Sequence, residues 1–324
     1  MRPGVPDGCK GGKPLLEIRN VIKRYDGLTA VDDLSLTIEP GGVFGLLGPN
    51  GAGKTTTIRM IMGIIEPDEG EIDVFGEPFS EKTKERIGYL PEERGLYRKM
   101  KVIDHLVFLG EIKGIPAKTA AERAVEWMRR LDLAGWEQKT VESLSKGMQQ
   151  KIQFISAVLH EPELMILDEP FTGLDPINIQ LLKDIITEMK EGGRTIVLST
   201  HLMDQVEKLC ERICLINRGR AVLEGDLAEI KMRFSKNILT LRYSGDRRTL
   251  EAHPGVERAT AFGREISVFL RDGADPNDVL RYAVERGRVE RFEIGEMSLH
   301  DIFIAQVQEK VGEVRDEAAQ SGQA

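Results

Sequence analysis

A glycine-rich segment near residue 50 combines residue types that bind phosphate. The sequence GPNGAGKTT, residues 48–56, fits the pattern GxxxxGK followed by Ser or Thr, and it lies between an apolar run and an amphipathic stretch. In such a loop, glycines let backbone N–H groups converge on phosphate oxygens at a helix N-terminus, whose dipole favours an anion. Lys54 is expected to reach the β- and γ-phosphates of ATP, and the Thr55 hydroxyl to bind Mg²⁺. The predicted ATP-binding residues of this loop are Gly48, Pro49, Asn50, Gly51, Ala52, Gly53, Lys54, Thr55 and Thr56.

Two carboxylates follow a second apolar run, LMILDEP, residues 164–170. A buried strand that ends in Asp168 can hold the Mg²⁺ shell from the side opposite Thr55, and Glu169 is placed to polarise a water against the γ-phosphate. A strand that ends in two acids is common by itself. Together with the phosphate loop, however, these acids predict a site for ATP hydrolysis with Lys54 and Glu169 as catalytic residues.

A second pair of acids, Glu92 and Glu93, lies in IGYLPEERGLY, residues 87–97. Proline followed by charges usually marks the end of a strand, so in isolation this segment predicts a solvated turn.

The segment ESLSKGMQQKIQ, residues 142–153, resembles the signature of ATP-binding subunits of ABC transporters, whose usual form is LSGGQ. Leu144, Ser145 and Gly147 match this signature. Lys146 and Met148 depart from its usual Gly and Gln. Ser145 is also a favourable N-cap for the helix that follows. The resemblance implies that Ser145, Lys146 and Gly147 face the γ-phosphate of ATP held by another subunit, so that two sites form only in a head-to-tail dimer.

The same resemblance implies roles for further residues. Tyr25, in KRYDGLTAV, stands where the family stacks an aromatic ring on adenine, and GLD, residues 173–175, stands where it communicates across the dimer. His201 matches the switch histidine that touches the γ-phosphate and is the third predicted catalytic residue. Glu92 occupies the position of a glutamine that binds Mg²⁺ in the loop before the helical insert. A carboxylate binds Mg²⁺ more strongly than an amide does, so Glu92 is predicted to be a metal ligand with Thr55 and Asp168.

The pattern of apolar residues predicts an α/β fold. Continuous apolar runs such as VFGLLG, LMILD, TIVLST and ICLIN are typical of a parallel sheet covered on both faces, and amphipathic helices separate them. We therefore expect a P-loop NTPase core with a mostly parallel sheet, an inserted helical subdomain and a small C-terminal α+β domain. The predicted segments are a flexible tail over 1–14, an ABC-type ATP-binding domain over 15–233 with its helical insert at about 93–160, an accessory domain over 234–311, and a second flexible tail over 312–324.

The composition limits the class of partner. The chain has 324 residues, with 45 basic and 53 acidic side chains, and a net charge of −8 argues against nonspecific nucleic-acid binding. Three cysteines are too few for a disulfide framework and suit a reducing compartment. No signal peptide is predicted, and no apolar stretch approaches the ~20 residues needed to span a bilayer. We therefore expect a soluble protein that reaches a membrane through a partner.

These patterns predict an ATPase, with ATP and Mg²⁺ bound, that energises an ABC transporter. The family resemblance implies a homodimer or a paired ATP-binding subunit, a separately encoded transmembrane permease, and a peripheral location on the cytoplasmic face of the cell membrane. EMSLHDIFI, residues 296–304, also resembles subunits of sodium-extrusion and drug or lipid efflux systems, which predicts an exporter. The transported substrate stays open, as does the role of the C-terminal domain.

Two other functions are alternatives to transport. A soluble ABC-type ATPase acting on ribosomes or nucleic acid usually carries two ATP domains or a long coiled coil, whereas this chain has one phosphate loop and no sustained heptads. A binding module without catalysis would lack a base, whereas Glu169, Lys54 and His201 are all present.

Overall fold

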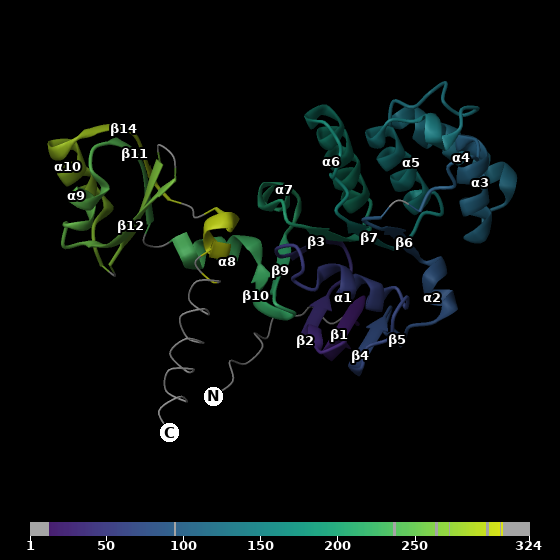
Figure 1. Cartoon of the computed structure of the whole chain (residues 1–324), viewed down its shortest axis with the longest axis horizontal. Coiled ribbons are helices and arrows are strands. Elements are labelled where there is room, and N and C mark those ends of the chain that lie inside the picture. Colours follow the sequence, from purple (N-terminus) through teal and green to yellow (C-terminus); the bar gives the residue numbers. More distant parts are fainter. Residues whose placement is uncertain are drawn as a thin grey trace. The chain divides into compact units, whose positions relative to one another are not determined.

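The structure is a computed structural model that describes residues 13–93, 95–235, 238–262, 265–271, 273–295, 298–304 and 306. The chain divides into two compact units, Met1–Glu224 and Gly225–Ala324 (Figure 1). The division falls inside strand β10, Arg220–Asp226, whereas the sequence places the boundary after residue 233. Most of the predicted N-terminal tail, and all of the predicted tail over 312–324, lie outside the described residues.

A six-stranded sheet forms the centre of the first unit, in the order β10-β9-β3-β8-β7-β6. The strands from β9 to β6 pair in parallel. Their bounds are Gly42–Leu47 for β3, Ile87–Leu90 for β6, Leu164–Asp168 for β7, Thr195–Thr200 for β8 and Arg212–Asn217 for β9. The three central strands are almost wholly buried, which explains their continuous apolar sequence. Because these strands run in parallel, the loops after their carboxyl ends gather along one edge of the sheet.

A second, antiparallel sheet lies beside the first and has the order β2-β1-β4-β5. Its strands are β1 (Leu16–Tyr25), β2 (Leu28–Ile38), β4 (Glu69–Val74) and β5 (Glu77–Pro78). Asp26 and Gly27, both with positive φ, form the tight turn between β1 and β2. This sheet was not predicted. Its strands carry charged residues on the outer face, so they lack the long apolar runs that identify the central strands.

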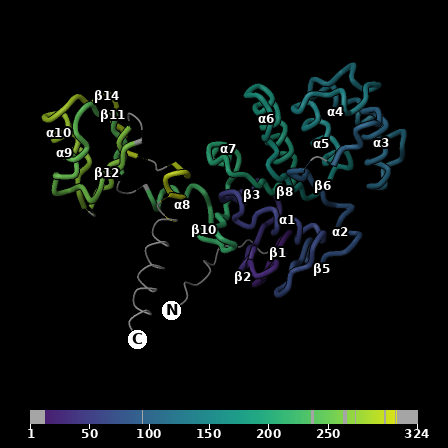
Figure 2. Tube along the Cα trace, viewed as in Figure 1, coloured from purple at the N-terminus to yellow at the C-terminus, as the bar shows by residue number. Residues whose placement is uncertain are grey.

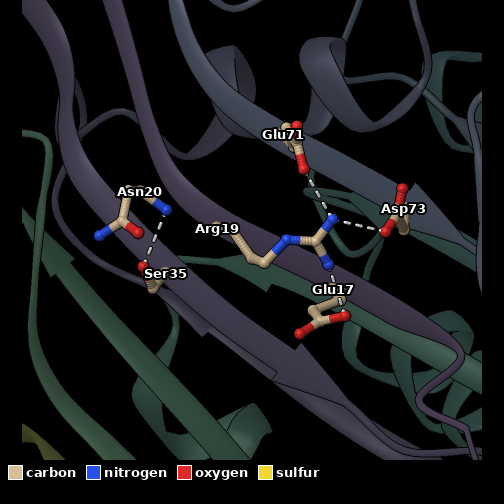
Figure 3. Close-up of polar contacts among 6 residues, drawn as sticks. All are labelled: Glu17, Arg19, Asn20, Ser35, Glu71 and Asp73. Atoms are coloured by element: carbon tan, nitrogen blue, oxygen red, sulfur yellow. Dashed lines mark hydrogen bonds and ion pairs between the residues drawn. The ribbon is translucent and has the colours of Figure 1, made fainter.

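Charged side chains on the outer face of this sheet form a small network. The guanidinium of Arg19 on β1 donates to Glu71 at 2.9 Å and to Asp73 at 2.6 Å on β4, and to Glu17 at 2.7 Å (Figure 3). Exposed ion pairs contribute little free energy individually. Arg19 stands directly opposite Glu71 in the pairing of β1 with β4, so this contact favours the observed register.

Three helices cover the strands near the pocket described below. Helix α1, Lys54–Ile61, contacts β2 and β4 of the antiparallel sheet and β7 of the parallel sheet, so it lies between the two sheets (Figure 1). Helices α6, Pro176–Glu191, and α7, Met203–Leu209, pack on β3 and β8. A short helix, α2, Glu81–Glu85, precedes β6. One core cluster joins apolar residues of both sheets with those of α1.

The segment between β6 and β7 is helical, as the periodicity predicts. It contains α3 (Val102–Ile112), α4 (Ala117–Arg130), a 3₁₀ turn (Val141–Ser143) and α5 (Lys146–Val158). Helix α3 packs on α4 and α5, and α5 returns the chain to the sheet against β6. The insert is therefore a helical subdomain attached to the sheet at the β6 edge.

The second unit contains a four-stranded antiparallel sheet in the order β12-β13-β11-β14. Its elements are α8 (Leu227–Ser235), β11 (Ile238–Ser244), α9 (Arg247–Glu251), β12 (Val256–Phe262), β13 (Glu265–Leu270), α10 (Pro276–Arg286) and β14 (Arg288–Ile294). Figure 2 shows α9 and α10 side by side along this sheet, and their apolar residues share one core with it. Alternating apolar residues on β11 and β13 provide that core, so this unit is a small α+β domain.

Candidate active site

A pocket of about 760 Å³ opens beside the carboxyl ends of the parallel strands. It is bounded by the β1–β2 hairpin, the start of α1, the loop after β6, the end of β7 and the turn between β9 and β10. The predicted residues that line it are Tyr25, Asn50, Gly51, Ala52, Gly53, Lys54, Thr55, Thr56, Glu92, Asp168 and Glu169. The fold therefore brings together residues from five segments that are far apart in the sequence.

The glycine-rich loop has a backbone shape that only glycine tolerates. Gly48 has a φ of 151°, and a Cβ on it would lie 2.2 Å from the carbonyl oxygen of Ile216. Gly53 has a φ of 110° and immediately precedes α1, and a Cβ there would lie 2.6 Å from the carbonyl oxygen of Ala30. The loop can therefore approach β9 and β2 closely. The first residues of α1, whose N–H groups have no partner within the helix, line the pocket.

Lys54 is a buried ammonium group at the start of α1. Its Nζ donates to the carbonyl oxygens of Gly48 at 2.7 Å and Pro49 at 3.2 Å. Burial lowers the pKa of Lys54, while the charges of Glu169 and Asp168 oppose that change. A phosphate in the pocket would restore the electrostatic environment that favours the charged ammonium.

Asp168, at the end of β7, is fully buried, and among the described residues neither of its carboxylate oxygens has a hydrogen-bond partner of good geometry. Burial raises the pKa of Asp168 and the charges of Glu92 and Glu169 raise it further, while the hydroxyls of Ser199 and Thr55 lower it. An unpaired buried carboxylate is costly, and a divalent cation would compensate it. The residues present therefore fit Mg²⁺.

The part of the chain that the structure describes holds no cluster of three acidic, His or Cys side chains arranged as a complete metal site. Mg²⁺ usually keeps water and substrate phosphates among its ligands and takes only one or two carboxylates. Thr55, Glu92 and Asp168, which line one pocket, are the side chains that could hold it.

The two acids after β6 lie in different surroundings. Glu92 lines the pocket, whereas the side chain of Glu93 is 87% exposed and approaches Arg59 at 3.7 Å. The side-chain amide of Gln153, on α5, donates to the carbonyl oxygens of Pro91 at 3.2 Å and Glu93 at 3.1 Å. The helical insert thus anchors the backbone that carries Glu92.

Glu169 is buried beside the pocket, and its backbone has a φ of 50°. Its Oε1 accepts from the backbone N–H of His201 at 3.1 Å and lies 2.8 Å from the ring Nδ1 of His201. Its Oε2 accepts from the hydroxyl of Thr200 at 3.1 Å. The side chain of His201 is half exposed and reaches the site through Glu169.

The outer end of the pocket has an exposed aromatic ring. Tyr25 and Leu28 flank the β1–β2 turn and are 44% and 68% exposed, so they offer an apolar surface that a flat base can cover. Arg218 and Gly219 also line the pocket. The backbone N–H of Gly219 donates to the carbonyl oxygen of Ala52 at 2.9 Å, which attaches this turn to the phosphate loop.

Five lining residues were not predicted: Leu28, Thr29, Ala30, Arg218 and Gly219. For Leu28 the sequence held a usable signal. The turn sequence Asp26-Gly27 places Leu28 opposite Tyr25 in one hairpin. Arg218 had no such signal. It reaches the pocket only because the β9–β10 turn is hydrogen-bonded to the phosphate loop.

The three predicted signature residues lie outside this pocket. The Ser145 hydroxyl caps α5 by accepting from the backbone N–H of Met148 at 3.2 Å, and Ser145 and Lys146 are exposed. Gly147 packs near the carbonyl oxygen of Gly173 and the side chain of Leu174. The structure therefore brings the signature and GLD segments together, at a place where they do not line the pocket of their own chain.

Comparison with known proteins identifies relatives of both units. Residues 31–172 match the ABC transporter family, and residues 225–307 match the C-terminal domain of ATP-binding proteins like DrrA1-3. The uncharacterized ABC transporter ATP-binding protein YhaQ of Bacillus subtilis is 46% identical over 93% of this chain and 99% of its own length. The daunorubicin/doxorubicin resistance ATP-binding protein DrrA of Streptomyces peucetius is 31% identical over 90% of this chain and 91% of its own length.

A solved structure supports the same assignment. The structure of an ATP-binding subunit of an ABC transporter superposes with a TM-score of 0.64 at 33% identity, and the match covers 68% of this chain and 93% of that one. The predicted P-loop NTPase fold is thereby confirmed. Within the residues that the structure describes, no helix is both long and apolar enough to cross a membrane. The chain belongs, as its motifs predict, to the family of ABC transporter ATP-binding subunits.

Proposed function

We propose that this chain binds and hydrolyses ATP and so energises an ABC exporter. The observation that carries the proposal is the convergence of Lys54, Asp168 and Glu169 on one pocket that begins at a helix N-terminus. A cation, a metal-binding carboxylate and a second carboxylate are the groups that phosphoryl transfer to water requires.

The residues of the chain have distinct roles in the proposed reaction. The backbone N–H groups of the loop and the start of α1 bind the phosphates, and Lys54 moves from its loop carbonyls to the β- and γ-phosphates. Thr55, Glu92 and Asp168 hold Mg²⁺, which neutralises charge on the phosphates when it is bound. Glu169 accepts a hydrogen bond from the attacking water, and His201 contacts the γ-phosphate. Tyr25 stacks on adenine.

Hydrolysis in this proposal requires two ATP-binding subunits. Ser145, Lys146 and Gly147 lie outside their own pocket and are at least partly exposed, so they are available to a nucleotide held by another subunit. A head-to-tail pair of subunits would complete two sites, either as a homodimer or with a second ATP-binding chain. The pair would bind a separately encoded transmembrane permease at the cytoplasmic face of the membrane.

Export is the proposed direction because of the relatives. Besides the daunorubicin/doxorubicin resistance protein, the linearmycin resistance ATP-binding protein LnrL of Bacillus subtilis is 35% identical over 71% of this chain and 76% of its own length. Both names describe resistance to a named compound, which export of that compound would provide.

The proposal is tested by purifying the chain from its native membranes in mild detergent and identifying what accompanies it. We expect a protein with several membrane-spanning helices, and a complex whose ATPase activity depends on Mg²⁺. Ribosomal or DNA-repair proteins as the only partners would contradict the transport function, even if ATP were hydrolysed. Absence of ATPase activity in the intact complex would contradict the catalytic function.

A further inference from the structure

Glu169 is fixed by the residues that end strand β8. In the pairing of β7 with β8, Asp168 stands opposite Ser199, so the next residue of each strand end, Glu169 and Thr200, meet at the edge of the sheet. Three groups from that end approach the carboxylate: the Thr200 hydroxyl, the His201 backbone N–H and the His201 ring. The orientation of Glu169 therefore depends on the end of β8.

The two oxygens of Glu169 are not equivalent. Oε1 has two partners, the backbone N–H and the ring nitrogen of His201, which together occupy the two acceptor positions that a carboxylate oxygen offers. Within the part of the chain that the structure describes, the partner of Oε2 is the Thr200 hydroxyl at 3.1 Å, which leaves one acceptor position. While the His201 ring contacts Oε1, Oε2 is therefore the carboxylate oxygen with room for a further hydrogen bond, such as one from a water.

The direction of the Thr200 hydrogen bond is fixed by a third group. The Thr200 oxygen accepts from the backbone N–H of Leu202 at 3.1 Å, so its single proton is directed to Glu169. The Thr200 residue is fully buried, which removes competition from solvent. A hydroxyl held in this way is a preorganised donor to one oxygen of the carboxylate.

The backbone of Glu169 also has an uncommon conformation. Its φ of 50° lies in the left-handed region, which a residue other than glycine adopts only when its surroundings impose it. His201 is half exposed and can leave Glu169 to contact a phosphate, whereas Thr200 is buried. The contact of Thr200 with Oε2 can therefore persist while His201 moves.

We propose that Thr200 is a positioning residue for ATP hydrolysis, which holds Oε2 of Glu169 toward the attacking water. This inference rests on the proposed function, because it assumes that Glu169 is the group that orients the water. Thr200 itself touches neither the water nor the nucleotide in this proposal. Its loss should therefore lower the rate of the chemical step and leave nucleotide affinity intact.

The test compares Thr200→Val, which keeps the shape and removes the hydroxyl, with Thr200→Ser, which keeps the donor. The matched control is Thr195→Val at the opposite end of β8, where a buried hydroxyl accepts from the backbone N–H of Gly41 at 2.8 Å, away from the pocket. In the intact complex we expect Thr200→Val to lower kcat by about 10- to 100-fold, because a hydrogen bond to a charged group is lost. KM and the Kd for ATP should change less than twofold, Thr200→Ser should restore most of the rate, and Thr195→Val should hydrolyse ATP like the wild type.

A double variant separates positioning from a general effect on the fold. If Thr200 acts through Glu169, adding Thr200→Val to Glu169→Gln should leave the residual rate unchanged, since residues that act as a unit are not additive. A further loss comparable with that of the single variant would overturn the inference. If Thr200→Val does not fold, Thr200→Cys, which keeps a weak donor, should lower kcat at unchanged ATP affinity.

The outcomes also separate this inference from the proposed function. If the wild-type complex hydrolyses ATP and Thr200→Val matches Thr195→Val in kcat, the positioning role is refuted and the ATPase stands. If the Glu169→Gln variant hydrolyses ATP at the wild-type rate, the role of Glu169 is refuted, and the positioning role of Thr200 with it. A complex with no hydrolysis at all refutes the proposed function.

Discussion

Glu92 and Asp168 face one pocket from the ends of two neighbouring parallel strands, β6 and β7. The charge of Glu92 contributes to the raised pKa of Asp168, although burial of Asp168 is the larger cause. Two carboxylates so placed repel each other and any phosphate unless a cation lies near them. Binding of ATP in this pocket should therefore depend strongly on a divalent metal.

Glu92→Gln should reduce that dependence. Without Mg²⁺, we expect this variant to bind ATP about three- to tenfold more tightly than the wild type, because one negative charge is gone. The Mg²⁺ concentration for half-maximal ATPase activity should rise, since an amide is the weaker ligand. Calorimetric titration with ATP in EDTA and an Mg²⁺ titration of the ATPase rate measure the two effects.

Glu93→Gln is the matched control, because it removes the same charge from the neighbouring, exposed residue. It should leave both quantities within twofold of the wild type. Equal effects of the two substitutions would mean that Glu92 acts only through its general charge and does not bind the metal.

Glu169→Gln should abolish turnover and retain ATP binding. The amide keeps the size of the side chain but cannot accept a proton from water, so we expect kcat to fall by at least about 100-fold. A filter-binding or calorimetric measurement should give an ATP affinity close to that of the wild type. Near-normal hydrolysis would exclude Glu169 as the base.

Lys54→Ala should weaken nucleotide binding itself. Burial in the loop holds the ammonium where it can meet two phosphates, and loss of charged hydrogen bonds should raise the Kd for ATP by about 10- to 100-fold. Lys82→Ala, on the exposed surface of α2, provides the control. An unchanged Kd in Lys54→Ala would refute the phosphate-loop interpretation.

The shape of the loop can be tested separately from its charge. Gly48→Ala places a Cβ against the carbonyl oxygen of Ile216 and should cost about 3 kcal/mol of unfolding free energy, with loss of ATP binding. Gly51 also has a positive φ, but a Cβ there meets no atom within 4 Å, so Gly51→Ala should cost about 1 kcal/mol. Thermal unfolding of both variants compares the costs. Similar destabilisation would show that the close approach to β9 is unimportant.

The parts of the site that lie within one short segment were predictable from the sequence. Residues 48–56 carry their own turn, helix start and charge, and Asp168 ends a strand that its apolar run already identifies. The central strand TIVLST coincides with β8. In each case, local spacing and the fold agree, because a single element positions the residues.

The remaining features depend on pairings between distant segments. In the sequence, Thr200 is one more β-branched residue of a predicted strand. Only the register of β7 with β8 places it against Glu169. Arg218 enters the pocket because its turn bonds to the phosphate loop. The antiparallel sheet was missed because its outer face is charged. A pattern of apolar residues does not encode these tertiary contacts.

Acid should destabilise the helical insert selectively. Burial lowers the pKa of His105, on α3, and that of His160, after α5, to about 4 from the usual value of 6.5. At pH 7 both residues are neutral in the folded state and mostly neutral in the unfolded chain. As the pH falls from about 6.5 to 4, the unfolded chain takes up protons that the folded chain does not, so stability decreases over this interval.

His105 gives the sharper test, because it is fully buried and neither of its ring nitrogens has a hydrogen-bond partner among the residues that the structure describes. At about 1.4 kcal/mol per pKa unit, it should contribute about 2 to 3 kcal/mol of destabilisation by pH 4. Urea unfolding at several pH values can be followed by tryptophan fluorescence, because Trp127 and Trp136 both lie in the insert. We expect His105→Leu to flatten the decline in stability between pH 6.5 and 4, and His300→Gln, at an exposed position of the other unit, to leave it unchanged. If the stability of His105→Leu fell as steeply with pH as that of the wild type, the buried imidazole would not be the source of the acid sensitivity.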